Sequence, residues 1–96
     1  MLTYKAMYKF LDADEGVHAE VLDFPGVITC GRDLDEARRL LASALVDIAE
    51  TNLSLGEPLP RPDPTRTSDE ADLEEPIHLL LTATNRVALV PQSVTP

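Results

Sequence analysis

The stretch LDFPGVITCGRD at residues 22–33 separates two hydrophobic patterns, and this separation constrains the fold more than any other feature. Before it, apolar and polar residues alternate as in a half-buried strand; after it, apolar residues recur at helical spacing. Within it, Pro25 presets φ for the first central position of a tight turn, and Gly26 accepts the positive φ of the second. The chain is therefore predicted to reverse direction at Asp23-Phe24-Pro25-Gly26 and to pass from sheet to helix after Gly31.

Three segments up to this point predict an antiparallel meander. Residues 2–11 alternate, with Tyr4, Ala6, Tyr8 and Phe10 on one face and Lys5 and Lys9 on the other. Residues 17–22 alternate again after a turn at 12–16, where Gly16 can take a positive φ. A short strand at 27–30 completes the meander.

A helix over roughly 34–54 is predicted next. Asp33 is a favourable N-cap, and Glu36 three residues later completes a capping-box-like pair. One apolar stripe runs along this segment, formed by Leu34, Ala37, Leu40, Leu41, Ala44, Leu45 and Ile48. Gly56 is the expected C-terminal stop.

Residues 57–75, EPLPRPDPTRTSDEADLEE, predict a connector. Prolines at every second position from 58 to 64 disfavour helix and sheet and favour an extended path. The acidic second half, 63–75, is expected to be mobile, with a short helical turn capped by Ser68 as an alternative. Order is predicted to return at 76–91, either as one long strand or as a hairpin of 77–83 with 86–90. After a crossover helix, this strand is expected to lie parallel to a member of the sheet.

These elements predict one α+β domain in the order β-β-β-α-β, with the helix on one sheet face. Residues 1–56 form its core, residues 57–75 the connector, and residues 76–96 the strand or strands that complete the domain. Aromatic residues are only 4% of the chain, so the core is thin and a homo-oligomer, dimeric or tetrameric, is expected.

The charge balance narrows the classes of partner. Seventeen acidic residues against eight basic ones give a formal net charge of −9, which disfavours binding to nucleic acid or to an anionic membrane. A single cysteine indicates a reducing compartment, and no apolar run approaches the ~20 residues of a membrane span. The sequence therefore predicts a soluble cytoplasmic protein.

Few residues suggest chemistry. Cys30 lies near the start of the following helix, which would favour a thiolate, but it is interpreted as a packing residue because it sits in a small apolar strand. Gly26 and Gly31 match no phosphate-binding glycine motif, and Asp33 would repel an anion at the helix start. His18 and His78 lack ligand spacing, so no metal site is predicted. The face of Lys5, Lys9 and Glu20 is interpreted as solvated, although a sheet edge could pair with another chain.

Taken together, GVHAEVLDFPGVITCGRDLDEARRLLASAL (16–45) resembles the HicB-like antitoxin family. The similar positions are Gly16, Ala19, the turn Asp23-Phe24-Pro25-Gly26, Thr29, Gly31 and the helix start Leu34-Asp35-Glu36-Ala37. The departures are Leu22 where the family often has proline, Val27 where it often has cysteine, and Asp33 where threonine is usual. No room is seen after residue 75 for the DNA-binding module that such antitoxins often carry, so no nucleic-acid binding is expected.

The resemblance implies a partial ribonuclease H-like fold that is catalytically empty, because neither residues 4–11 nor residues 77–91 offer acids for two-metal chemistry. It implies a non-enzymatic protein without cofactors that neutralises a small, basic, HicA-type mRNA-cleaving toxin. The sheet edges and the acidic segment are expected to meet this partner, the latter through Asp69, Glu70, Asp72, Glu74 and Glu75. Two alternatives remain open at this point: a stand-alone oligomer with a small-ligand or regulatory role, and a Cys30-dependent enzyme.

Overall fold

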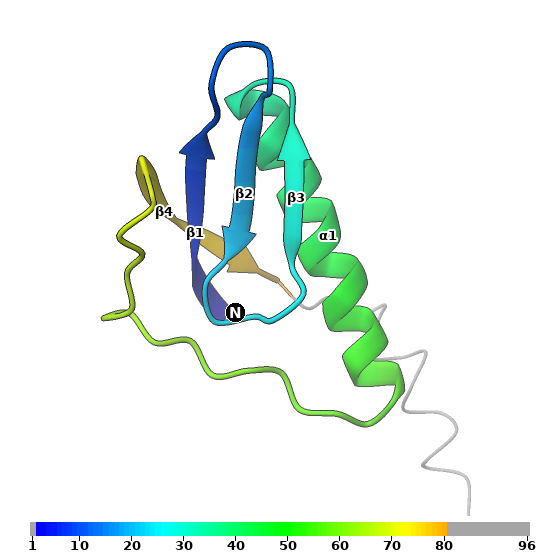
Figure 1. Ribbon diagram of the computed structural model, residues 1–96. Helices are drawn as coiled ribbons and strands as arrows, with labels where there is room; N and C mark the ends of the chain where they lie inside the picture. The colour runs from blue at the N-terminus through cyan, green and yellow to red at the C-terminus, as the bar shows by residue number, and fades with distance from the viewer. Residues whose placement is uncertain (1, 81–96) are drawn as a thin grey trace, which may run out of the picture.

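A four-stranded antiparallel sheet and one helix make up the part of the chain that the computed structural model describes, residues 2–80 (Figure 1). In chain order the elements are β1 (Leu2–Phe10), β2 (Val17–Val21), β3 (Ile28–Gly31), α1 (Leu34–Ser54) and β4 (Leu73–Leu79). The strands lie in the order β3-β2-β1-β4, and α1 covers one face of the sheet. The predicted α+β class and the order of its elements are confirmed. No helix within residues 2–80 has the length and apolar character needed to cross a membrane.

The hydrophobic core lies between α1 and the sheet. From the helix it receives Ala37, Leu41, Leu45 and Ala49, and from the sheet it receives Tyr4, Ala6, Tyr8, Val17, Ala19, Val21 and Leu79. Phe24 closes one end of the core and packs on Tyr4, with the ring centroids 5.5 Å apart. Phe10 was predicted on this face, but its side chain is half-exposed. It is the last residue of β1, and β2 separates it from Gly31 of β3, where the helix approaches the sheet.

The turn between β2 and β3 has the geometry that its sequence favours. Pro25 and Gly26 occupy its central positions, Gly26 has φ +91°, and the Val27 N–H donates to the Phe24 carbonyl at 3.2 Å. Positive φ at the second central position is the mark of a type II turn. Buried Phe24 and Val27 on either side fix this turn to the core.

Both ends of α1 are capped. The Asp33 carboxylate accepts the Glu36 N–H at 2.8 Å. The Glu36 carboxylate reaches back to the N–H of Arg32, also at 2.8 Å, and not to that of Asp33 as in a standard capping box. At the other end, Gly56 at φ +76° closes a Schellman motif in which the Glu57 N–H donates to the Asn52 carbonyl.

The end of β3 touches the backbone of α1. A Cβ placed on Gly31 would lie 2.5 Å from the Ala37 nitrogen and 2.9 Å from its Cα, so only glycine permits this approach. On the other side, the backbone of Gly16 packs against the Gly31 carbonyl, which leaves no space for a Cβ there either. Gly31 therefore holds helix and sheet together as well as preceding the helix.

The last strand differs from its prediction in position and direction. It begins at Leu73 instead of 77, so the connector comprises residues 57–72, and it pairs antiparallel with β1 instead of parallel to any strand. The direction follows from the path of the connector, which runs from Pro60 beside Tyr4 to Asp72 beside Tyr8, so that the chain enters β4 at the C-terminal end of β1. Pro76 is accommodated because β4 lies at the edge of the sheet that residues 2–80 form. The predicted strand at 86–90, and with it the choice between one strand and a hairpin, lies outside the described residues.

We expect Gly31→Ala to destabilise the fold by about 2–3 kcal/mol, because the new Cβ would have to push the first turn of α1 away from the sheet. Gly26→Ala is the matched control: it meets open space, and its cost of about 1 kcal/mol comes from positive φ alone. Urea unfolding followed by circular dichroism measures both. An equal or smaller loss for Gly31→Ala would contradict the close-contact explanation.

Candidate partner-binding surface

The connector, which was predicted to be partly stiff and partly mobile, is hydrogen-bonded along the sheet at several points. The Tyr4 hydroxyl donates to the Pro60 carbonyl at 2.6 Å, and the Asp63 N–H donates to the Asp23 carboxylate at 2.8 Å. Proline carbonyls lack a ladder partner here, yet they can accept hydrogen bonds from side chains of the sheet. The connector therefore follows an ordered path from the helix side of the sheet to its other face.

Two basic side chains hold the connector on that other face. The Lys5 ammonium donates to the carbonyls of Pro64 at 3.2 Å and Arg66 at 2.7 Å, and it lies 3.9 Å from Glu74. The Arg66 guanidinium donates to the Leu22 carbonyl at 2.9 Å and lies 3.3 Å from Asp23, whose side chain is only 7% exposed. Lys5 was predicted to be a solvated surface residue; it is instead a clamp, because the connector crosses above it.

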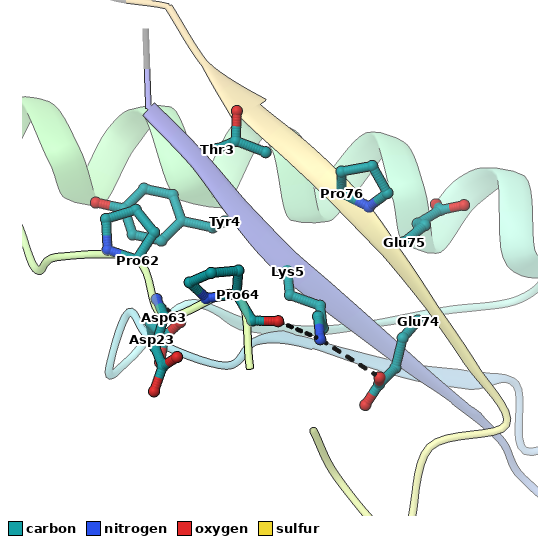
Figure 2. Close-up of a pocket in the computed structure, with 10 residues that line it drawn as sticks. All are labelled: Thr3, Tyr4, Lys5, Asp23, Pro62, Asp63, Pro64, Glu74, Glu75 and Pro76. Atoms are coloured by element: carbon teal, nitrogen blue, oxygen red, sulfur yellow. Dashed lines mark hydrogen bonds and ion pairs between the residues drawn. The ribbon is translucent and has the colours of Figure 1, made fainter. Parts of the chain in front are cut away.

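A groove of about 320 Å³ remains between the connector and β4 (Figure 2). Thr3 and Lys5 of β1 lie between its two sides, with Pro62, Asp63 and Pro64 on the connector side and Glu74 and Pro76 on the β4 side. Asp23, Tyr4 and Glu75 complete the lining. The groove is thus walled by proline rings and carries carboxylates at its rim.

The five acids predicted to meet a partner do not form one surface. Asp69 and Glu70 are exposed in a turn in which the Ala71 N–H donates to the Ser68 carbonyl, so Ser68 stabilises a turn and not a helix. Asp72 accepts the Phe10 N–H at 2.7 Å, and Glu74 accepts the Ser68 N–H at 2.8 Å. Glu75 lies on the opposite face of β4 from Glu74, because neighbouring strand residues alternate.

On the helix side of the sheet, Glu75 forms a pair of hydrogen bonds with the Arg38 guanidinium at 2.7 and 2.9 Å. The hydrogen bonds from Arg38 hold the pKa of Glu75 below its usual range. Burial, reinforced by the Glu75 carboxylate, raises the pKa of Tyr8 to about 12. Burial and the nearby charge of Asp23 likewise raise the pKa of Tyr4. The contacts among Arg38, Glu75 and Tyr8 join α1, β4 and β1.

The remaining candidates lie on the sheet face opposite α1. Cys30 was expected to pack in the core but is exposed, because Thr29 and Gly31, not Cys30, take the inner positions of β3. His18 stands opposite Cys30 in the β2–β3 pairing and contacts Glu20 at 3.1 Å, while His78 contacts the Thr3 hydroxyl at 3.0 Å. Over residues 2–80, no three His, Cys, Asp or Glu side chains are grouped so as to hold a metal ion.

This arrangement defines a small α+β domain: a three-stranded meander, a helix on its face and a returning edge strand. Residues 3–60 match the sequence model of the UPF0150-like family, and the chain belongs to that family. Among curated proteins, no sequence matches it.

Two solved structures, both of HicB antitoxins, share the fold. The N-terminal domain of the antitoxin HicB from Burkholderia pseudomallei has 21% sequence identity and a TM-score of 0.66, over 83% of this chain and 100% of that domain. The B. pseudomallei antitoxin HicB has 19% identity and a TM-score of 0.54. That alignment covers 98% of this chain but only 57% of the antitoxin.

We expect Asp23→Ala to loosen the connector, because it removes both the acceptor of the Asp63 N–H and the partner of Arg66. Loss of about 1 kcal/mol of local stability corresponds to about fivefold faster tryptic cleavage after Arg66. Asp23→Asn, which keeps an acceptor oxygen, should have a smaller effect, and Asp47→Ala on the exposed side of α1 should have none. Equal cleavage of Asp23→Ala and the wild type would show that Asp23 does not hold the connector.

The two tyrosines give a pH prediction. Both have raised pKa values, so their phenols should ionise in the native protein only above pH 10, with Tyr8 near pH 12. A raised folded-state pKa means that this stabilisation is complete below pH 10 and is lost as the pH rises towards about 12, because the unfolded chain ionises first. Phenolate absorbance, recorded native and in denaturant, measures it, and Tyr8→Phe should remove the highest transition. A native midpoint near 10 for both phenols would contradict the burial argument.

Proposed function

We propose that this protein is a non-catalytic antitoxin that binds and neutralises a small, basic, HicA-type mRNA-cleaving toxin. The observation that carries the proposal is the structural likeness to the N-terminal domain of a HicB antitoxin, which extends over 83% of this chain and the whole of that domain. Membership of the UPF0150-like family over residues 3–60 adds support from the sequence.

The distribution of charge supports a basic partner. All seventeen acids lie within residues 2–80. Within the same residues, five basic side chains lie 2.7–3.9 Å from carboxylates of this chain: Lys5, Arg32, Arg38, Arg39 and Arg66. Much of the positive charge is therefore neutralised internally, and the surplus of negative charge is left for a partner. Such complementarity speeds association with a basic protein and favours the correct partner over wrong ones.

The positions of the acids in the sheet support a non-catalytic role. β1 contains no acid, and Glu74 and Glu75 of β4 project to opposite faces, so they do not converge as two-metal chemistry requires. We further propose that the protein works in the cytoplasm, where an mRNA-cleaving toxin acts, and that it assembles as a dimer or tetramer, since subunit contacts would extend a core of few aromatic residues.

Co-expression tests the function. A HicA-type toxin encoded beside the gene should arrest growth of a bacterial host, and this protein, expressed in trans, should restore growth. The two proteins should co-purify as a complex whose mass by light scattering gives the stoichiometry, and their association rate should fall as salt rises. The Gly31→Ala variant, destabilised by its fold defect, provides a control with lowered neutralisation. Unchanged growth arrest together with the absence of a complex would contradict the proposal.

A further inference from the structure

We propose that the groove between the connector and β4 binds an arginine side chain presented by the basic partner. This inference rests on the proposed function and names the place where that partner is anchored. It starts from the groove itself, whose volume of about 320 Å³ lies at the lower end of the range for ligand sites and has room for one long side chain.

The walls of the groove suit a weakly hydrated cation. The rings of Pro62 and Pro64 line the connector side, the ring of Pro76 lines the β4 side, and Thr3 lies between them (Figure 2). Guanidinium is planar and more weakly hydrated than ammonium, so it enters such an apolar slot at lower desolvation cost. Arginine therefore fits the groove better than lysine does.

Carboxylates on the two sides provide acceptors. Asp63 receives both of its hydrogen bonds from Thr65 on Oδ1, and these bonds hold the pKa of Asp63 below its usual range, so the group is ionised. Glu74 accepts the Ser68 N–H on Oε2, while its Oε1 is only loosely approached by Lys5 at 3.9 Å. Asp63 and Glu74 thus line the groove from its connector side and its β4 side, and each has an oxygen that can accept from an incoming guanidinium.

Lys5, the one cation that lines the groove within residues 2–80, does not oppose this. Lys5 directs its ammonium at the carbonyls of Pro64 and Arg66, so its charge is already solvated by the connector. The other two carboxylates of the lining are also occupied, Asp23 by Arg66 and Glu75 by Arg38. Because these contacts fix the connector before any partner arrives, binding costs little reorganisation.

A small guanidinium compound tests the groove without the partner. Butylguanidinium is titrated into ¹⁵N-labelled protein, with neutral butylurea as the matched control compound. We expect saturable amide shifts centred on Thr3, Lys5, Asp63 and Glu74, and at least fivefold weaker binding of butylurea. Shifts that do not saturate, or that are equally large at the exposed acids of the 12–15 and 69–70 turns, would overturn the proposal.

Three variants sharpen the test. Asp63→Asn keeps the Oδ1 acceptor for Thr65 and removes the charge, so it should weaken butylguanidinium binding at least fivefold without unfolding the connector. Thr3→Arg places a guanidinium of the protein itself in the groove, so it should prevent butylguanidinium from binding there. Ser43→Arg adds the same charge on the exposed side of α1 and should leave the probe unaffected. Normal probe binding to Thr3→Arg, with the variant folded by circular dichroism, would overturn the assignment.

Measurements of toxin binding distinguish the proposal for the groove from the proposal for the antitoxin function. If the wild type neutralises the toxin, Thr3→Arg should bind that toxin at least tenfold more weakly than Ser43→Arg does. Equal binding by the two variants would overturn the groove as the anchoring site while leaving the antitoxin function intact. Failure of the wild type to neutralise any HicA-type toxin would instead remove the function, whatever the probe shows.

Discussion

The contact between the end of β3 and the first turn of α1 sets the spacing of the two layers. Backbone meets backbone at Gly31 and Ala37, and from that point the helix lays a narrow stripe of small and aliphatic residues across the sheet. Alanines at both ends of the stripe and leucines in its middle keep the layers close over its whole length. A chain with few aromatic residues can fill such a shallow interlayer space, whereas a wider separation would leave it underpacked.

On the other face of the sheet, the connector provides a second packing layer. Met7 is buried although it faces away from α1, and Lys5, Asp23 and Arg66 draw the connector across this region. Extended, proline-rich backbone has few conformations to lose on docking, so a handful of side-chain hydrogen bonds suffices to order it. The groove beside β4 exists because this docked segment and the edge strand stand on either side of β1.

Local signals made much of the fold predictable, while distant partners decided the rest. The Pro25-Gly26 turn, the Asp33 cap and the Gly56 stop each depend on neighbours within a few residues, and each lies where the sequence places it. The start of β4 depends instead on a distant strand. Glu74, Glu75 and Pro76 are poor strand formers, and they join the sheet because β1 pairs with them. Cys30 shows the same limit, since a shift of one residue in register exchanges the two faces of a strand.

The candidate site was the least predictable part for the same reason. Its acids were visible as a run of charge, but their roles depend on contacts such as Lys5 to Pro64 and Arg38 to Glu75, which join residues 59 and 37 positions apart. No spacing rule in a single sequence reports such pairs. Asp23 was correctly located in the turn, yet its bond to the connector lies 40 positions away.

The route of the connector also determines where relatives of this protein could vary in length. From Pro60 to Arg66 the backbone is tied to the sheet at several points, so an added residue would break register with Tyr4, Asp23 and Lys5. Asp69 and Glu70, by contrast, are exposed at the tip of a turn whose ends are joined by the bond between Ser68 and Ala71, and Ser68 is held to Glu74 of β4. Insertions, epitope tags or fused domains would be tolerated at this turn, so it is the position where the domain can be lengthened with least effect on its fold.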